Sequence, residues 1–329
     1  ALYYLATTRS PHAGQDSQLL NWEALQAPEP QIVGRLVADI TTKNETRTVE
    51  MRLIREQKAP GQVSFRREAL VNRRKVRLMD MLGQLQVVMF LPEDVNLITG
   101  APNKRRRYLN VMLCQIDPHY CRTLSQYNKV LEQRNASLRQ GNPALVRSLD
   151  PQFLQFGTQL HDMRVAVFER LAPLVESLVH VMSPQLGEIS VRMKSGWGQG
   201  TLEESLLEGF EKDREQGMTR YGPHRADLVF RVDGRAVRDR FSRGEQKLLA
   251  AALLLAQATL FSEDGHRPVV LLDDLSSEFD QSHLDQVLHH VAQLGAQHFV
   301  TGTEAAPYDR WRQADSTVFH VKQGAIQIG

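Results

Sequence analysis

Residues 241–257 read FSRGEQKLLAAALLLAQ, and residues 269–274 read VVLLDD. The first stretch places a short polar phrase before a long apolar run, which predicts a helix buried in a protein core. The second places four aliphatic residues before two carboxylates, which predicts a strand buried on both faces that ends at Asp273 and Asp274. Because ligands of open α/β sheets bind beyond the carboxyl ends of the strands, we expect a functional site at this edge.

The polar phrase admits two interpretations. Ser242 and Glu245 match a helix capping box, in which each side chain bonds the backbone N–H of the other residue. The box does not explain Gly244, which costs up to about 1 kcal/mol relative to Ala inside a helix, nor Gln246 among residues that enter a core. A helix N-terminus with a hydroxyl and a bare backbone is a good phosphate site. Both interpretations hold together.

The two carboxylates also admit two interpretations. A carboxylate at the end of a buried strand holds Mg²⁺, usually through water. A second carboxylate beside it orients or deprotonates an attacking water. The alternative is that Asp273 and Asp274 cap the loop and the next helix.

The rest of the chain divides into three parts. A helix end and a β-meander occupy the first ninety residues, with strands at 31–40, 48–54, 61–65 and 84–91. Helical periodicity then runs from 103 to 182, with a break at 141–143. The last part alternates helix and strand, which predicts parallel strands joined by right-handed crossovers. Its expected elements are a strand at 187–194, a helix at 201–217, hairpins at 227–237 and at the C-terminal end, strands at 269–272 and 297–301, and a helix at 282–294.

Bulk composition excludes little. The net charge is +2, but basic residues cluster at 66–77 and 104–107. Clustered Lys and Arg side chains contact phosphates, and a solvated helix face is the alternative. No apolar run reaches the roughly 18 residues that a membrane helix needs. The two cysteines, Cys114 and Cys121, are expected to be reduced thiols of a cytosolic protein.

The spacing of the motifs is more specific than any single motif. Ser-x-Gly-x-Gln at 242–246, the buried helix, Asp-Asp at 273–274, Ser-Glu-Phe-Asp at 277–280 and Thr-Gly-Thr at 301–303 stand in one order. That order is the signature loop, Walker B, D-loop and switch of an ABC-type ATPase head. The chain resembles the RecF family of the SMC/ABC-type ATPase group, through the phrases ALYYLATTRS (1–10), FLPEDVNLITGAPNKRRRYLN (90–110), YNKVLEQRN (127–135), GPHRADL (222–228), FSRGEQKLLAAALLLAQ (241–257) and LLDDLSSEFD (271–280).

The resemblance implies an α/β fold, namely a P-loop NTPase head of the ABC/SMC type with an inserted helical lobe. Residues 1–100 and 215–329 would form the ATPase head, lobe I, without its N-terminal P-loop segment. Residues 101–214 would form the helical lobe II.

The resemblance also assigns roles to the signature loop. Ser242, Arg243 and Gly244 would bind the γ-phosphate of an ATP held by the other subunit, and Gln246 would support the loop. A signature loop acts only opposite the P-loop of another subunit, so an ATP-dependent homodimer is expected.

In the same resemblance Asp273 would organise Mg²⁺. Asp274 would be the catalytic carboxylate, at a position where many ABC ATPases carry Glu, and a shorter carboxylate fits slow hydrolysis. Ser277 and Asp280 belong to the D-loop at the dimer seam. Thr303, or a neighbour, takes the place of the switch His of transporters.

Further candidate residues lie outside these loops. Glu93 and Asp94 follow a strand where ABC heads have their Q-loop, and a Mg²⁺-linked role for them is a weak hypothesis. The candidate DNA contacts are Arg105, Arg106, Arg107 and Arg225. Their alternative role is ion pairing within the domain, and His224 beside Arg225 has the alternative of a packed structural residue. DNA binding through these arginines would depend steeply on salt.

One departure from the family concerns the P-loop. The motif GxxxxGK[ST] precedes the helix that ends in a phrase like ALYYLATTRS, and it does not occur in this sequence. That motif supplies a Lys to the phosphates and a Ser or Thr to Mg²⁺. We expect that the sequence begins after this segment, and that the chain as given does not bind ATP normally or hydrolyse it.

The implied function is ATP- and Mg²⁺-dependent DNA binding in recombinational repair and replication. The protein would act in the cytoplasm, at single-strand gaps and junctions of single- and double-stranded DNA. It would help load the recombinase with a RecR-type mediator during the SOS response, with weak DNA-dependent ATPase activity and no membrane partner. One alternative is the head of a structural SMC-like chromosome ATPase, which needs a helical insert long enough for an arm. Another is an ABC transporter subunit, against which the switch Thr and the absence of a membrane-coupling motif argue.

Overall fold

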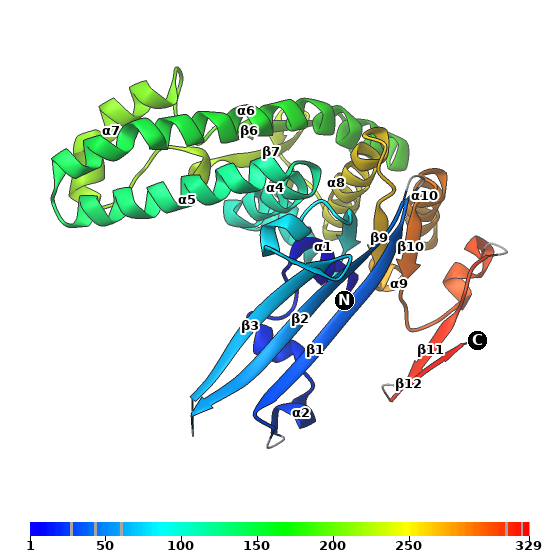
Figure 1. Ribbon diagram of the computed structural model, residues 1–329. Helices are drawn as coiled ribbons and strands as arrows, with labels where there is room; N and C mark the ends of the chain where they lie inside the picture. The colour runs from blue at the N-terminus through cyan, green and yellow to red at the C-terminus, as the bar shows by residue number, and fades with distance from the viewer. Residues whose placement is uncertain (27–28, 43–44, 60–61, 313–314, 324, 329) are drawn as a thin grey trace.

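The computed structural model describes residues 1–26, 29–42, 45–59, 62–312, 315–323 and 325–328. Its centre is a parallel three-stranded sheet in the order β10-β9-β5 (Gln297–Val300, Val269–Leu272, Val87–Phe90). A long antiparallel meander extends from one side of this sheet, and a helical arm covers the other (Figure 1). The predicted strands at 269–272 and 297–301 are confirmed as parallel neighbours, and the structure adds that β5 from the first hundred residues is the third strand.

The meander forms a four-stranded sheet in the order β1-β2-β3-β4 (Gln31–Thr41, Thr46–Ala59, Gln62–Val71, Arg74–Val76). The predicted strands are confirmed, but β2 and β3 are longer than expected and β4 was missed. One face of β2 packs on the short helix α1 (Leu2–Thr7), where Tyr4 and Leu5 meet Met51 and Leu53 in one apolar cluster. Helix α2 (Trp22–Gln26) joins α1 to the meander.

The helical arm consists mainly of α4 (Pro102–Ile116), α5 (Pro118–Arg139) and α6 (Pro143–Met182), and the short helix α3 (Asn96–Thr99) precedes it. Two of these helices begin where the sequence offers N-terminal caps. The side chain of Asp117 accepts the N–H of His119 at the start of α5, and the side chain of Asn142 accepts the N–H of Leu145 at the start of α6. The helical region and its break at 141–143 are therefore confirmed.

A second antiparallel sheet lies against this arm, with the order β6-β7-β8 (Ile189–Lys194, Asp227–Val232, Arg235–Ala236). Helix α7 (Leu202–Gln216) lies between β6 and β7 in the chain, and Thr201 with Glu204 forms the predicted capping box at its start. Because β6 pairs with β7, this sheet crosses the boundary that the sequence places between residues 214 and 215.

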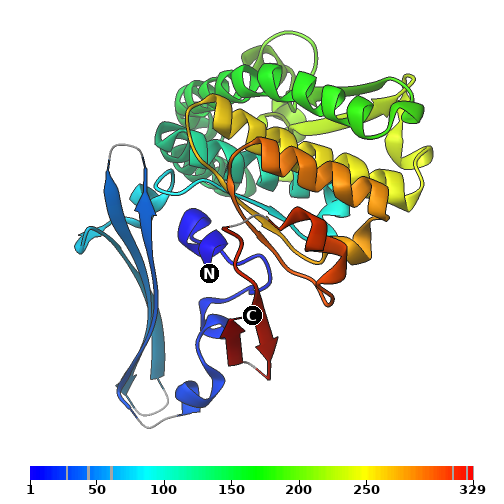
Figure 2. The same ribbon diagram turned by 90° about the vertical axis from the view of Figure 1, so that its right-hand side faces the viewer.

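The apolar helix of the opening stretch is α8 (Arg243–Glu263), which is buried on every side from Leu248 to Ala258. It packs against α6, β5 and α10 (Gln281–Gln293), so one continuous apolar cluster joins the arm to the parallel sheet. The short helix α9 (Leu275–Glu278) follows β9, and a hairpin of β11 and β12 (Phe319–Lys322, Ala325–Ile328) ends the chain. The N-terminus lies between the meander and this hairpin (Figure 2). In the described part of the chain no helix is long and apolar enough to cross a membrane.

Candidate nucleotide-binding surface

The polar phrase before α8 forms the capping box that its spacing predicts. The side chain of Ser242 accepts the N–H of Glu245 at 3.4 Å, and the Glu245 carboxylate accepts the N–H of Ser242 at 2.6 Å. The side-chain amide of Gln246 donates to the carbonyl of Phe241 at 2.8 Å. Gln246 therefore ties the loop to the helix that carries it, which is a supporting position.

Gly244 is not required by the fold of this chain. Its φ lies outside the left-handed region, and a Cβ added there meets no atom within 4 Å. Ser242, Arg243 and Gly244 are all exposed. Neither backbone conformation nor packing in the described structure therefore explains this glycine.

The end of β9 meets the end of β10. The hydroxyl of Thr301 donates to the Asp273 carboxylate, and Thr301 also accepts the N–H of Asp274 through its carbonyl at 3.2 Å and its hydroxyl at 3.3 Å. Asp274 has a φ of 50° and a ψ of 42°, a region that non-glycine residues seldom occupy. Thr301, at the end of the neighbouring strand, therefore holds the carboxylate of Asp273 and the backbone of Asp274.

One oxygen of this pair has no partner. The Oδ1 atom of Asp274 is buried and accepts no hydrogen bond in the described structure. Buried carboxylate oxygens are normally satisfied, so an orphaned one marks a place for a cation or a bound water. No group of three or more His, Cys, Asp and Glu side chains in the described residues forms a metal cage. Mg²⁺ characteristically binds one or two carboxylates and completes its shell with water and substrate phosphates, and Asp273 with Asp274 fits that pattern.

The switch assignment to Thr303, or a neighbour, stays a prediction, and the two threonines of this segment have different surroundings. Thr303 is exposed and makes no described hydrogen bond to either carboxylate, whereas Thr301 contacts both aspartates. Tyr308, in a short 3₁₀ helix after β10, accepts the N–H of Ser276 at 2.9 Å and donates to the carbonyl of Thr301 at 3.4 Å. The sequence offered no spacing signal for Tyr308, because it lies in an irregular segment.

The D-loop residues lie between β9 and α10. Ser277 is exposed, and its N–H bonds the carbonyl of Asp274 at 3.2 Å. Asp280 is exposed and caps α10, where it accepts the N–H and the Nδ1–H of His283, each at 2.9 Å. The backbone N–H of His283 is the main reason that the pKa of Asp280 is lowered. The local structure thus explains Asp280 as a cap, and its role at a dimer seam stays a prediction.

Arg105 is a correction to the set of expected DNA contacts. Its side chain is only 9% exposed and forms a two-pronged ion pair with Asp227, at 2.7 and 3.1 Å. It also donates to the carbonyls of Leu97 and Gly100. This geometry is the alternative, intradomain ion pairing, and four of the five N–H donors of the buried Arg105 are used within the domain.

The other three arginines remain accessible to different degrees. Arg106 is half-buried and donates to the carbonyl of Ala226 at 2.9 Å, which places it beside the exposed Arg225. The pKa of Arg106 is lowered by burial first, with smaller contributions that include the charge of Arg225. Residues about 120 positions apart in the chain therefore lie side by side, and Arg107 lies exposed on another side of α4.

His224 is a packed structural residue. Its Nε2 faces the carbonyl of Thr219 at 3.1 Å, so this nitrogen carries the proton, and Nδ1 accepts the hydroxyl of Tyr127 at 2.7 Å. Burial lowers the pKa of His224 to about 4, so the ring is neutral near pH 7. Of the two interpretations of His224, the structure favours the structural one.

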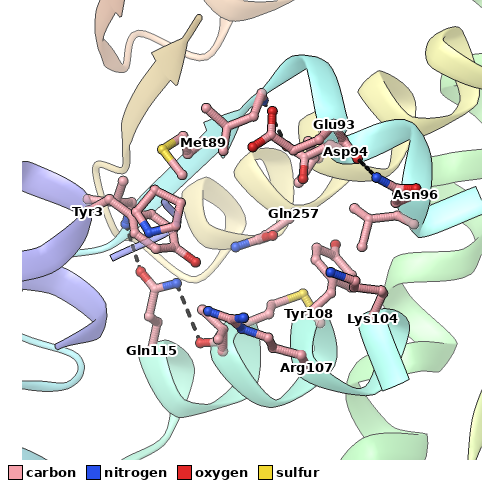
Figure 3. A pocket seen from close by; sticks show the side chains of 17 residues that line it. Tyr3, Met89, Glu93, Asp94, Asn96, Lys104, Arg107, Tyr108, Gln115 and Gln257 are labelled. Atoms are coloured by element: carbon pink, nitrogen blue, oxygen red, sulfur yellow. Dashed lines mark hydrogen bonds between the residues drawn. The ribbon is translucent and has the colours of Figure 1, made fainter. Parts of the chain in front are cut away.

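A cavity of about 170 Å³ lies between α1, β5, α4 and α8 (Figure 3). Asp94 lines it, accepts the N–H of Leu91 at 2.8 Å, and has a pKa raised to about 7 by burial. The amide of Gln257 points into the same space. Among the described contacts none joins Glu93 or Asp94 to Asp273, so the weak hypothesis of a Mg²⁺-linked role gains no geometric support.

The fold and these loops define an α/β protein of the ABC/SMC type of P-loop ATPase head. No protein-family model matches the sequence. The chain is 34% identical over 354 residues to the DNA replication and repair protein RecF of Chloroflexus aurantiacus, an alignment that covers 100% of this chain and 90% of that protein. It is 35% identical to RecF of Herpetosiphon aurantiacus, over 99% of this chain and 89% of that protein. The chain belongs to the RecF family.

A solved structure agrees on the fold. The structure of the recombination mediator protein RecF-ATP in the RecFOR pathway superposes with a TM-score of 0.76 at 23% identity, covering 99% of this chain and 86% of that one. This likeness confirms the fold class that the motif spacing predicts.

Proposed function

We propose that this protein is an ATP-dependent DNA-binding subunit that acts at single-strand gaps and at junctions of single- and double-stranded DNA. Two copies would enclose two ATP molecules, and with a RecR-type mediator the dimer would help load the recombinase in the cytoplasm. The observation that carries the proposal is Gly244, which the fold does not require, beside the exposed Ser242 at the N-terminus of a buried helix.

The signature loop would act through its backbone and one hydroxyl. Helix α8 presents the positive end of its dipole and the N–H groups of its first turn at Arg243 and Gly244, beside the hydroxyl of Ser242, which favours an anion such as a γ-phosphate. The capping box and the bond from Gln246 to Phe241 hold these groups in place before any ligand arrives. The loop would therefore bind only when the ATP of the other subunit still carries its γ-phosphate.

The carboxylates at the end of β9 would act on the nucleotide of their own subunit. Asp273, fixed by Thr301, would hold Mg²⁺ through water, and Asp274 with its unpartnered Oδ1 would hold and orient the attacking water. The bound Mg²⁺ would neutralise the charge that develops on the phosphates. An Asp in place of Glu at this position fits slow hydrolysis, which suits a switch rather than a motor.

DNA would bind through phosphates at the surface that Arg106 and Arg225 form. Both arginines lie beside Ala226, and Arg105 beneath them is neutralised by Asp227, so it stabilises the surface without joining it. Phosphate contacts of this kind bind without sequence preference and weaken with salt.

The shape of the arm supports a compact lobe rather than an SMC-like arm. Residues of α5 and α6, such as Tyr127, Phe153 and Leu160, lie in the same apolar cluster as α8. Helix α7 and the β6-β7-β8 sheet pack on this helix pair, so the helices form a lobe with its own core and not a bare projecting coiled coil. The RecF-like function is therefore preferred to the structural chromosome ATPase.

The test is association of the protein, as its gene encodes it, with ATP and Mg²⁺. Light scattering after size exclusion should show dimers with ATP and monomers without it. Ser242→Arg should remove the ATP-dependent dimer, because a bulky cation at the cap blocks the approach of the other subunit. Ser148→Arg, at an exposed position on α6, is the matched control and should dimerise normally. An unchanged balance of monomer and dimer in Ser242→Arg would contradict the proposal.

A further inference from the structure

The signature helix and the D-loop helix are joined by one ion pair. The Nζ atom of Lys247, in the second turn of α8, lies 2.6 Å from Oε2 of Glu278, the last residue of α9. The two side chains are only 17% and 15% exposed. The contact therefore differs from the other lysine pair of the described chain, Lys75–Glu68, in which the lysine is 67% exposed.

This ion pair is the polar link between the two segments. Among the described hydrogen bonds and ion pairs, no other joins residues 241–247 to residues 275–280. The remaining polar contacts of the D-loop with other residues run to Asp274, His283, Leu284 and Tyr308. If Lys247 and Glu278 separate, the start of α8 and the D-loop lose their direct connection.

A role for this ion pair follows from where Lys247 and Glu278 lie relative to the two loops. Lys247 lies five residues after Ser242, and Glu278 lies two residues before Asp280. The pair thus links the segment that carries the exposed signature loop to the segment that carries the exposed D-loop. A partly buried pair loses more when one partner is removed than an exposed pair does, because the remaining charge stays partly desolvated.

We propose that Lys247 and Glu278 are a positioning pair that holds the signature loop and the D-loop as one unit facing the partner subunit. Neither side chain contacts the nucleotide; each acts through the loop that carries it. The proposal rests on the proposed function of these two loops. It predicts that the loops loosen together when the pair is broken and tighten together when a partner closes on either of them.

The first experiment measures hydrogen exchange in the protein as its gene encodes it, without nucleotide. Lys247→Met keeps the aliphatic stem and removes the charge, and Glu278→Gln removes the other charge. Each variant should raise amide exchange about ten-fold in both 241–247 and 275–280. Lys247→Arg and the double swap Lys247→Glu with Glu278→Lys should restore exchange to the wild-type rate. Arg214→Met, which breaks the exposed pair with Glu211 on α7, is the matched control and should change neither segment.

The second experiment measures ATP-dependent association of the same variants. Lys247→Met should weaken the dimer about ten-fold, and the double swap should recover it. The positioning role is overturned if exchange rises in only one segment, if the swap fails to restore exchange in a protein with wild-type melting temperature, or if association is unchanged when both segments loosen. A wild-type protein that never dimerises with ATP would instead contradict the proposed function, while the exchange data would still decide whether the pair couples the loops.

Discussion

The hydroxyl of Thr301 donates a hydrogen bond to the carboxylate of Asp273, so the end of one parallel strand orients the side chain at the end of its neighbour. The same hydroxyl accepts the N–H of Asp274 at 3.3 Å. One short side chain therefore positions both aspartates that we assign to metal and water. Within the segment 301–303, we therefore propose Thr301, a neighbour of Thr303, as the residue on which the site depends.

Replacing Thr301 tests that assignment. Thr301→Val removes the hydroxyl, and because groups that orient metal ligands are typically worth 10- to 100-fold in affinity or activity, we expect Mg²⁺-dependent ATP hydrolysis to fall about ten-fold. The free energy of unfolding should fall by about 1 kcal/mol, the usual contribution of one hydrogen bond. Thr303→Val is the matched control and should keep the wild-type rate. Equal losses in both variants would show that the hydroxyl of Thr301 has no special role.

Replacing Gly244 by alanine should affect stability and ATP-dependent dimerisation in opposite directions. Alanine fits there without contact, and the folded chain should gain up to about 1 kcal/mol because alanine favours the helix. The added methyl group would stand where the phosphate approaches, so ATP-dependent dimerisation should weaken. Thermal melting and light scattering on Gly244→Ala measure the two effects. A variant that is more stable and dimerises as well as the wild type would mean that nothing approaches the glycine.

The arginines separate structural from DNA-binding roles. Arg105→Ala leaves the partly buried Asp227 without its partner, so it should cost about 3 kcal/mol of unfolding free energy, seen as a lower melting temperature. Arg225→Ala should leave melting unchanged, weaken DNA binding equally for all sequences, and reduce the slope of log affinity against log salt by about one. Binding of gapped DNA at several salt concentrations measures the slope. If Arg225→Ala keeps the wild-type slope of log affinity against log salt, Arg225 does not contact DNA phosphates.

Asp94 gives a dependence of stability on pH. Burial raises the pKa of Asp94 in the folded protein to about 7 from an ordinary 3.8. Between these two values the folded state keeps a proton that the unfolded chain has lost, so the contribution of Asp94 to the free energy of unfolding falls as the pH rises. Asp94→Asn should remove this slope between pH 4 and pH 7, in denaturant titrations at several pH values, and should be more stable than wild type at pH 8. Glu93→Gln, at the exposed neighbour, is the control and should keep the wild-type dependence of unfolding free energy on pH. If Asp94→Asn also keeps this dependence, a group other than Asp94 causes it.

The features that the sequence predicted were local in the chain. The capping box of Ser242 with Glu245, the box of Thr201 with Glu204 and the strand that ends at Asp273 depend on spacings of a few residues, and all three are present. The order of the loops along the chain predicted the fold class, because an ABC-type ATPase head carries these loops in a fixed order.

The features that the sequence missed were contacts between distant segments. The arginine run at 105–107 has one residue on each of three sides of a helix, and only tertiary packing decides that Arg105 turns inward to Asp227. Thr301 and Thr303 are equivalent in the sequence, and the register of β10 against β9 selects Thr301. Tyr308 and the pair of Lys247 with Glu278 likewise depend on distances that no periodicity encodes.

The central claim is that residues 242–246 of one subunit complete the site that contains Asp273 of the other. The most direct measurement is ATP hydrolysis by a mixture of two inactive variants of the protein as its gene encodes it, Ser242→Ala and Asp273→Asn. Ser242→Ala removes the hydroxyl without adding the bulk that would block dimerisation. In a mixed dimer one composite site carries both changes and the other carries neither. We expect each variant alone to be inactive and an equal mixture to recover about a quarter of the wild-type rate, because half of randomly formed dimers are mixed and each has one intact site of two. A mixture as inactive as its components, in which mixed dimers are shown to form, would contradict the account.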